Sequence, residues 1–178
     1  DEGVRHLTEL AGAGVAVSVL TNSLSATDVA AVHGGYAPYR KPLLAGGVRL
    51  FELKREGAVA DLSLRGSSSA SLHTKAFTVD DRIGFIGSLN LDPRSVSLNT
   101  EMGLLFELPE LVATMRALFA EEISPQMSYA LQLGSDGALF WKAESDGAST
   151  RFETEPEASY VRRLLARVVG WLPLESQL

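Results

Sequence analysis

The hydrophobic and polar positions of this chain follow two periods, one typical of helices and one typical of strands. Glu2–Ala11 is predicted to be a helix that is closed by Gly12 and Gly14. The next run, VAVSVL at 15–20, is apolar and β-branched, which is typical of a strand buried on both faces. A helix followed by a buried strand favours an α/β architecture.

The two periods continue along the chain. Further helices are expected at 29–33, 109–122 and 157–170, and further strands at 48–53, 72–79, 83–88, within 99–108, and in the segments YALQL and ALFWKAE. The turn-like DDR at 80–82 joins its neighbouring strands into a predicted hairpin. The turn GSDG at 134–137 joins the last two strands in the same way.

Composition places the chain among folded, acidic proteins. With 178 residues, 46% of them hydrophobic and 21% charged, it can form one domain with a core, and disorder is not expected. The formal net charge of −6 argues against nonspecific nucleic-acid binding, although it does not exclude a small basic pocket. The chain has no cysteine, which excludes disulfides and thiol nucleophiles.

The chain starts at Asp1 without a signal peptide, so we expect a segment of a longer protein. No apolar run approaches the roughly 18 residues of a membrane-spanning helix.

A histidine and a lysine stand two residues apart in the strand-like segment LHTKAFTV. Because such residues share one face of a strand, His73 and Lys75 are expected to project together. Histidine can act as a nucleophile or as a general acid and base, and lysine supplies positive charge for a phosphoryl oxygen. If the strand after the hairpin continues, Ser88 and Asn90 share a face and can donate hydrogen bonds to an oxyanion. This set predicts a pocket for a tetrahedral phosphorus centre. No acidic or histidine cluster has metal-ligand spacing, so neither a metal nor another cofactor is expected.

The spacing of the whole motif is more informative than the pair. A lone strand histidine and lysine are typical of a half-exposed face with an ordinary solvated lysine. Six fixed positions at average residue frequencies occur by chance on the order of once in 10⁵ to 10⁶ chains of this size. The pattern H-x-K-x4-D-x6-G-S-x-N is filled by His73, Lys75, Asp80, Gly87, Ser88 and Asn90.

This stretch resembles the HxKxxxxD signature of the phospholipase D superfamily with its trailing GSxN, and most closely bacterial cardiolipin synthases and related phospholipase D-like proteins. The segment from VLTNSLSATD to VRLFEL resembles the start of their second catalytic half, NLDPRSVSLNTEMGL its continuation and LPLESQL its C-terminus. The resemblance implies one phospholipase D-like lobe over 1–178. Its expected fold is α/β, with a mixed, largely parallel sheet and helices on both faces, and 125–178 adding strands and a helix to the same domain.

The resemblance also implies roles for individual residues. His73 would attack phosphorus to form a phosphohistidine, or protonate the leaving alcohol, since these roles fall to the two histidines of a paired site. Lys75 and Asn90 would hold the non-bridging phosphate oxygens, with Ser88 assisting. Glu101 matches the acidic residue that, in similar enzymes, orients the motif histidine and selects its tautomer.

Weaker candidates have structural alternatives. Asp80 matches the motif aspartate, but its place in the predicted turn favours a structural role. Tyr36, Tyr39 and Arg40 lie in GGYAPYRKPLL, where similar synthases have residues near the lipid headgroup; the alternative is a surface helix with snorkelling side chains. Arg94 could bind a phosphate or pair with an acidic side chain, and the structural role is favoured.

Three further features carry less weight. Thr21 and Asn22 follow the first strand, where α/β proteins place ligands, but this is an analogy of fold alone. His33 has no matching partner and is expected to be incidental. Trp141 and Trp171 are expected in the core rather than as lipid anchors.

The motif occurs once, whereas the chemistry needs two proton-active groups. Family members supply the second group either from a second motif in the same chain or from the mate in a homodimer. We expect an N-terminal half with a second motif, or a homodimer mate, as the partner. The segment alone is therefore expected to be weakly active or inactive.

The predicted function is phosphatidyl transfer between phospholipids through a phosphohistidine. The resemblance implies a phosphatidylglycerol-like substrate and a peripheral location at the bacterial cytoplasmic membrane. One alternative is hydrolysis of a phospholipid or of a nucleic-acid phosphodiester, and the acidic composition disfavours the nucleic acid. Another is a noncatalytic half that binds anionic lipid, against which the intact motif argues.

Overall fold

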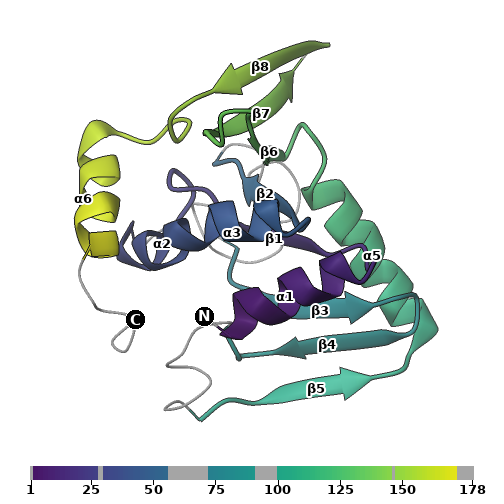
Figure 1. Cartoon of the computed structure of the whole chain (residues 1–178). Helices are drawn as coiled ribbons and strands as arrows, with labels where there is room; N and C mark the ends of the chain where they lie inside the picture. Colours follow the sequence, from purple (N-terminus) through teal and green to yellow (C-terminus); the bar gives the residue numbers. More distant parts are fainter. Residues whose placement is uncertain (1, 28–29, 56–71, 91–99, 146, 172–178) are drawn as a thin grey trace. The chain divides into compact units, whose positions relative to one another are not determined.

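The computed structural model describes residues 2–27, 30–55, 72–90, 100–145 and 147–171, which form two compact units (Figure 1). The first unit contains the described residues up to Leu72 together with those from Ile123 onward. The second unit contains those of residues 73–122. The sequence motif begins at the first residue of the second unit.

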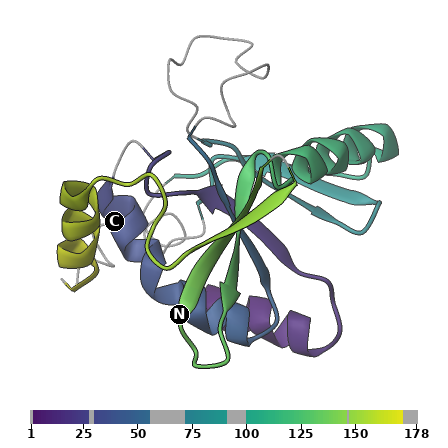
Figure 2. The same cartoon turned by 90° about the horizontal axis from the view of Figure 1, so that it is seen from above.

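The first unit is built on a five-stranded sheet with the order β1-β2-β6-β7-β8. Its strands are β1 (Ser18–Asn22), β2 (Arg49–Leu53), β6 (Ser128–Leu133), β7 (Leu139–Ser145) and β8 (Ala148–Phe152). β1 and β2 are parallel because helical segments carry the chain back between them, and the other neighbours are antiparallel. The β6–β7–β8 strands can be followed in green in Figure 2.

This topology confirms the mixed α/β fold but corrects two details. Only the β1–β2 pairing of the described sheets is parallel, so the expectation of a largely parallel sheet is wrong. The physical reason is the length of the connections: the turn at 134–137 and the two residues between β7 and β8 are too short for a parallel crossover. The first strand begins at Ser18 and is half-buried along its length, not buried on both faces.

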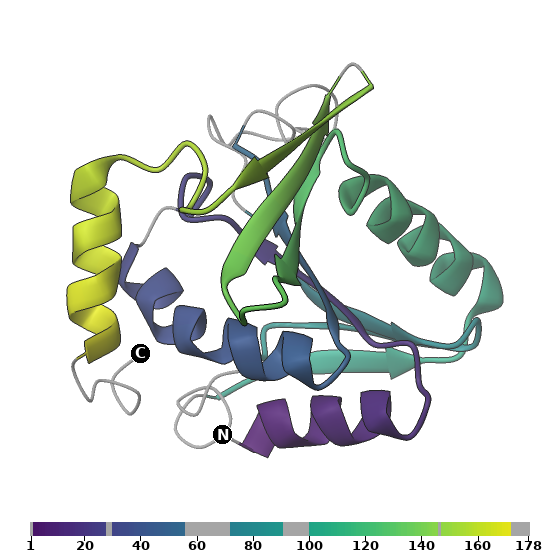
Figure 3. The ribbon, with the colours of Figure 1, turned by 45° about the horizontal axis from the view of Figure 1, so that its top comes forward.

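Helices flank this sheet within the first unit. They are α1 (Glu2–Gly12), α2 (Ala30–Tyr36), the 3₁₀ turn η1 (Ala37–Tyr39), α3 (Arg40–Ala45) and α6 (Tyr160–Trp171). α3 contacts β2 and β6, α1 packs on α3, and α6 lies beside α2 (Figure 3). The approach of α1 to α3 requires a glycine, since a Cβ on Gly46 would lie 2.3 Å from the Thr8 methyl carbon.

The core of the first unit lies between the sheet and these helices. Leu50, Tyr129, Leu131 and Trp141 form a buried cluster. The core position predicted for Trp141 is therefore confirmed, with 4% of the residue exposed. The side chain of Trp171 lies outside the described residues.

The second unit is an antiparallel sheet with one helix. The strands β3 (Lys75–Val79), β4 (Ile83–Gly87) and β5 (Gly103–Phe106) pair in that order, and α5 (Pro109–Glu122) contacts β3 and β4. The predicted hairpin and the predicted helix at 109–122 are confirmed. Gly84 allows Phe106 to lie across the sheet, because a Cβ there would be 2.5 Å from its ring.

Candidate active site

Antiparallel pairing brings most of the motif to one end of the second unit. Lys75 in β3 pairs with Gly87 in β4, and Gly87 pairs with the first residue of β5. The residues that flank these strands therefore gather there: His73 before β3, Ser88 after β4 and Glu101 before β5. We call these residues, with Lys75 and Asn90, the motif edge.

His73 is exposed and lies outside the strand that follows it. Lys75 is the first residue of β3, and its ammonium nitrogen lies 2.9 Å from the carbonyl oxygen of His73, to which it donates. The prediction that His73 and Lys75 share one face of a strand is therefore not confirmed, because β3 begins at Lys75 and His73 precedes it. The lysine binds the backbone of the histidine segment while remaining only half-buried.

Ser88 and Glu101 are joined by a side-chain hydrogen bond at the motif edge. The Ser88 hydroxyl lies 2.5 Å from a carboxylate oxygen of Glu101, within the range of O–H···O⁻ hydrogen bonds. The Ser88 hydroxyl also accepts from the backbone N–H of Met102 at 3.0 Å. The Ser88 side chain thus connects the end of β4 to the two residues that precede β5. The role expected for Glu101 on His73 stays a prediction.

Asn90 is exposed and lies beyond the end of β4. The expectation that Ser88 and Asn90 share a strand face depended on the strand continuing, and β4 ends at Gly87. A side chain at Gly87 would lie 2.7 Å from the Met102 carbonyl oxygen, so the chain approaches β5 closely at this point. Arg94 lies outside the described residues.

Asp80 lies at the opposite end of the hairpin. β3 separates it from the motif edge by five residues, or roughly 16 Å of extended chain. Its φ of 51° is in the left-handed region, which aspartate tolerates better than most residues. Its carbonyl oxygen accepts a hydrogen bond of 2.9 Å from Arg116 of α5. These features agree with a structural role at the turn.

Arg40 lies in the core of the first unit and not on a surface helix. Only 3% of the residue is exposed, and its guanidinium donates to Glu52 at 2.8 Å and to Glu155 at 2.7 Å. The rings of Tyr36 and Trp141 lie 5.1 and 5.2 Å from the guanidinium carbon. The alternative of a surface helix with a snorkelling side chain is therefore wrong for Arg40, because Glu52 and Glu155 neutralise its charge inside the core. A contact of this residue with a lipid headgroup stays a prediction.

The electrostatics of this cluster reflect the pairing. Burial acts to lower the pKa of Arg40, but the charges of Glu52 and Glu155 outweigh it and raise the pKa above its usual range. Burial also acts to raise the pKa of Glu155, but the hydrogen bond with His33 and the charge of Arg40 lower it to about 2. Burial, with the nearby Glu52 charge, raises the pKa of Tyr36 well above the ordinary tyrosine value.

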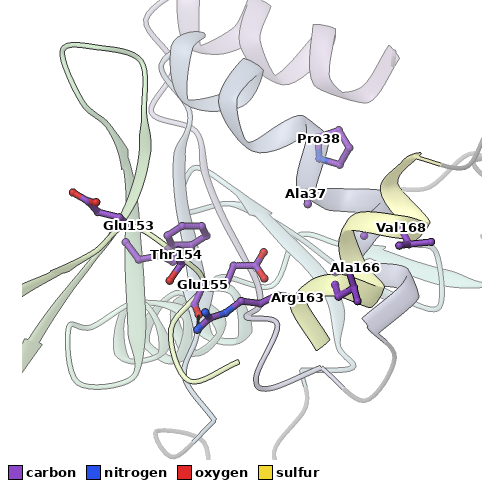
Figure 4. Close-up of a pocket in the computed structure, with 11 residues that line it drawn as sticks. Ala37, Pro38, Glu153, Thr154, Glu155, Arg163, Ala166 and Val168 are labelled. Atoms are coloured by element: carbon purple, nitrogen blue, oxygen red, sulfur yellow. Dashed lines mark hydrogen bonds between the residues drawn. The ribbon is translucent and has the colours of Figure 1, made fainter. Parts of the chain in front are cut away.

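A cavity of about 530 Å³ opens in the first unit beside this cluster (Figure 4). Trp141, Leu164 and other apolar residues line it, together with Glu155 and Arg163. No described residue of the motif edge lines it. Within the described ranges, no three His, Asp or Glu side chains come together as a metal site would require. No helix in the same part of the chain is long and apolar enough to cross a membrane.

Comparison with known proteins adds to this geometry. The family model described as "Cardiolipin synthase, PLD-like domain" matches residues 1–123, which include the motif edge. The chain belongs to this family. The recognition of a cardiolipin synthase-like, phospholipase D-like chain is thereby confirmed, and the family is one of phospholipase D superfamily enzymes.

The relatives are longer than this chain. Cardiolipin synthase C of Escherichia coli strain K12 is 41% identical over 179 residues, covering 97% of this chain and 37% of the relative. An uncharacterized protein of Helicobacter pylori strain 26695 is 32% identical over 160 residues, covering 90% of this chain and 31% of that protein. The chain thus spans about a third of the curated relatives it matches. No solved structure matches it.

Sequence reasoning missed the partners of two residues of this family member. His33 was expected to be incidental, yet it is buried and lies 3.1 Å from a carboxylate oxygen of Glu155, 122 residues later. Glu52 lies in the buried strand β2 and accepts from Trp141 at 2.8 Å. A charged residue inside the apolar run VRLFEL was the one available signal, because buried carboxylates are nearly always paired.

Proposed function

We propose that this chain supplies one half of a phosphatidyl-transfer site that makes a cardiolipin-like product through a phosphohistidine. The observation that carries the proposal is the convergence of His73, Lys75, Ser88 and Glu101 at one end of the three-stranded sheet. Membership of the cardiolipin synthase family supports phosphatidyl transfer as the reaction class. The proposed substrate is a phosphatidylglycerol-like phospholipid.

In the first step, a ring nitrogen of His73 attacks phosphorus and forms a P–N bond. The P–O bond to the leaving alcohol breaks, and that oxygen takes a proton from a second acidic group. In the second step, the incoming alcohol gives its proton to the same group, and its oxygen displaces the imidazole. Lys75 and Asn90 hold the non-bridging oxygens as negative charge develops, assisted by Ser88.

The second proton-active group must come from outside this motif. We place it in a second motif of the full-length protein, or in a homodimer mate carrying the same motif. The first source is supported by the length of the E. coli relative, of which this chain covers 37%. The assembled enzyme would meet its lipid at the surface of the cytoplasmic membrane.

Lipid mass spectrometry on the full-length protein tests this function. Wild type and His73→Ala are incubated with vesicles containing phosphatidylglycerol, and the products are identified by mass. A cardiolipin product from wild type that His73→Ala does not form is expected. Formation of that product at equal rates by both proteins would contradict the proposal.

Hydrolysis is the second candidate, and the exposure of His73 favours it, since water can reach the phosphohistidine. The same assay separates the two, because water as acceptor yields phosphatidic acid in place of cardiolipin. Cleavage of a DNA phosphodiester without either lipid product would instead indicate a nuclease. Lipid binding without turnover by wild type would indicate a noncatalytic half.

A further inference from the structure

The side chain of Asn22 binds the backbone of a residue fifty positions later in the chain. Asn22 is the last residue of β1 and is half-buried. Its Nδ2 donates to the carbonyl oxygen of Leu72 at 2.9 Å, and its Oδ1 accepts from the N–H of Leu72 at 2.7 Å. The carboxamide thus pairs with Leu72 as a neighbouring strand residue would, through one donor and one acceptor.

Leu72 directly precedes His73, so hydrogen bonds to Leu72 act on the backbone next to the motif histidine. The Leu72 carbonyl belongs to the peptide group that joins Leu72 to His73. A peptide group is planar, so a hydrogen bond to its oxygen restrains the orientation of the His73 amide and Cα. The next carbonyl, that of His73, accepts from Lys75 at 2.9 Å. The peptide groups on both sides of His73 are therefore held by side chains.

We propose that Asn22 is a positioning residue for His73, acting through the Leu72–His73 peptide. This inference rests on the proposed function, in which His73 attacks phosphorus. The two hydrogen bonds to Leu72 need one donor and one acceptor on the same side chain, which a carboxamide provides. Aspartate keeps the acceptor for the Leu72 N–H but loses the donor to the carbonyl, and alanine loses both.

A matched control exists in the same unit. Arg162 also makes two long-range hydrogen bonds to backbone, donating to the carbonyl oxygens of Ser25 at 3.1 Å and Thr27 at 2.7 Å. Arg162→Ala therefore removes the same number of side-chain-to-backbone bonds without touching Leu72. It reports the effect of lost stability alone.

The test compares Asn22→Ala, Asn22→Asp, Arg162→Ala and His73→Ala in the full-length protein. Because misplacement of a reacting group by about 1 Å can cost on the order of 100-fold in rate, both Asn22 variants should lower kcat by about 10- to 100-fold with KM little changed. Arg162→Ala should leave kcat within about twofold. Asn22→Asp nearly conserves side-chain volume, so it keeps the test decisive if Asn22→Ala does not fold.

Ring-labelled histidine NMR supplies a readout that does not depend on turnover. The His73 ring signals, assigned by their loss in His73→Ala, should shift and broaden in Asn22→Asp and stay unchanged in Arg162→Ala. An inactive His73→Ala with fully active Asn22 variants and unmoved His73 signals would overturn this inference while leaving the proposed function intact. A fully active His73→Ala would instead overturn the proposed function.

Discussion

At the scale of single residues, the motif separates into two groups. His73, Lys75, Ser88 and Glu101 meet at one end of the hairpin sheet, and Asp80 stands at the other end. Asp80 is too far from the motif edge to contact a phosphate bound there, because an extended strand spans about 3.3 Å per residue and β3 has five residues. Substitutions should therefore affect activity at one end and stability at the other.

Ser88→Ala tests the motif edge. The change removes a hydrogen bond to the Glu101 carboxylate, of a kind worth about 1.5 to 3 kcal/mol, and leaves that carboxylate free to turn away. We expect kcat of the full-length protein to fall by at least about tenfold in the lipid-transfer assay. Ser88→Thr keeps the hydroxyl and should retain most of the activity. Equal activity of Ser88→Ala and wild type would show that the contact is only structural.

Asp80→Asn tests the turn. Asparagine tolerates the left-handed backbone at φ 51° as well as aspartate does, so activity and thermal stability should both stay close to wild type. Asp80→Val should lower stability by about 1 to 2 kcal/mol, because a β-branched residue is strained in that conformation. Thermal unfolding and the transfer assay measure the two effects. A large loss of kcat in a stable Asp80→Asn variant would assign the aspartate to catalysis.

At the scale of elements, charged pairs connect segments that are distant in sequence. Arg40 at the start of α3 binds Glu52 in β2 and Glu155 in the loop after β8, and Trp141 of β7 also donates to Glu52. Removing one partner leaves a buried charge unpaired, which costs more than the pair itself contributes. The position of α3 is therefore stabilised by residues of β2, of β7 and of the loop after β8.

The pH dependence of stability follows from Glu155. Its pKa is lowered to about 2 in the folded protein, below the ordinary value of about 4.3 in the unfolded chain. The ionised carboxylate thus stabilises the fold above pH 5, and this contribution is lost as the pH falls toward 2. Urea unfolding at pH 7 and pH 3 should show wild type losing on the order of 1 to 3 kcal/mol more than Glu155→Gln. Equal losses would exclude the carboxylate as the cause.

At the scale of the whole molecule, the chain carries one complete motif and spans about a third of its relatives. The proposed chemistry needs a second acid–base group besides His73. The described residues of the motif edge contain no second histidine that could serve as this group. The net charge of the chain is −6, so its overall charge does not attract a phosphate. A phosphate group would instead be bound by a local positive charge such as that of Lys75.

The isolated 178-residue chain should turn over phosphatidylglycerol at least about a hundredfold more slowly than the full-length protein, because one of the two acid–base groups is missing. Circular dichroism must first show that the isolated chain is folded. If a homodimer supplies the second group, specific activity should instead rise with protein concentration. Full activity at all concentrations would contradict the proposed half-site.

The family, the hairpin at 75–87 and the helix at 109–122 can be predicted from local sequence patterns, because each depends on residues close together in the chain. The burial of Arg40, the mainly antiparallel pairing of the strands and the binding of Leu72 by Asn22 depend instead on how distant segments pack in the folded chain. These features join residues separated by up to 115 positions. A local pattern reports the period and polarity of its own segment, whereas the pairing of distant polar groups is set by which segments the fold brings together.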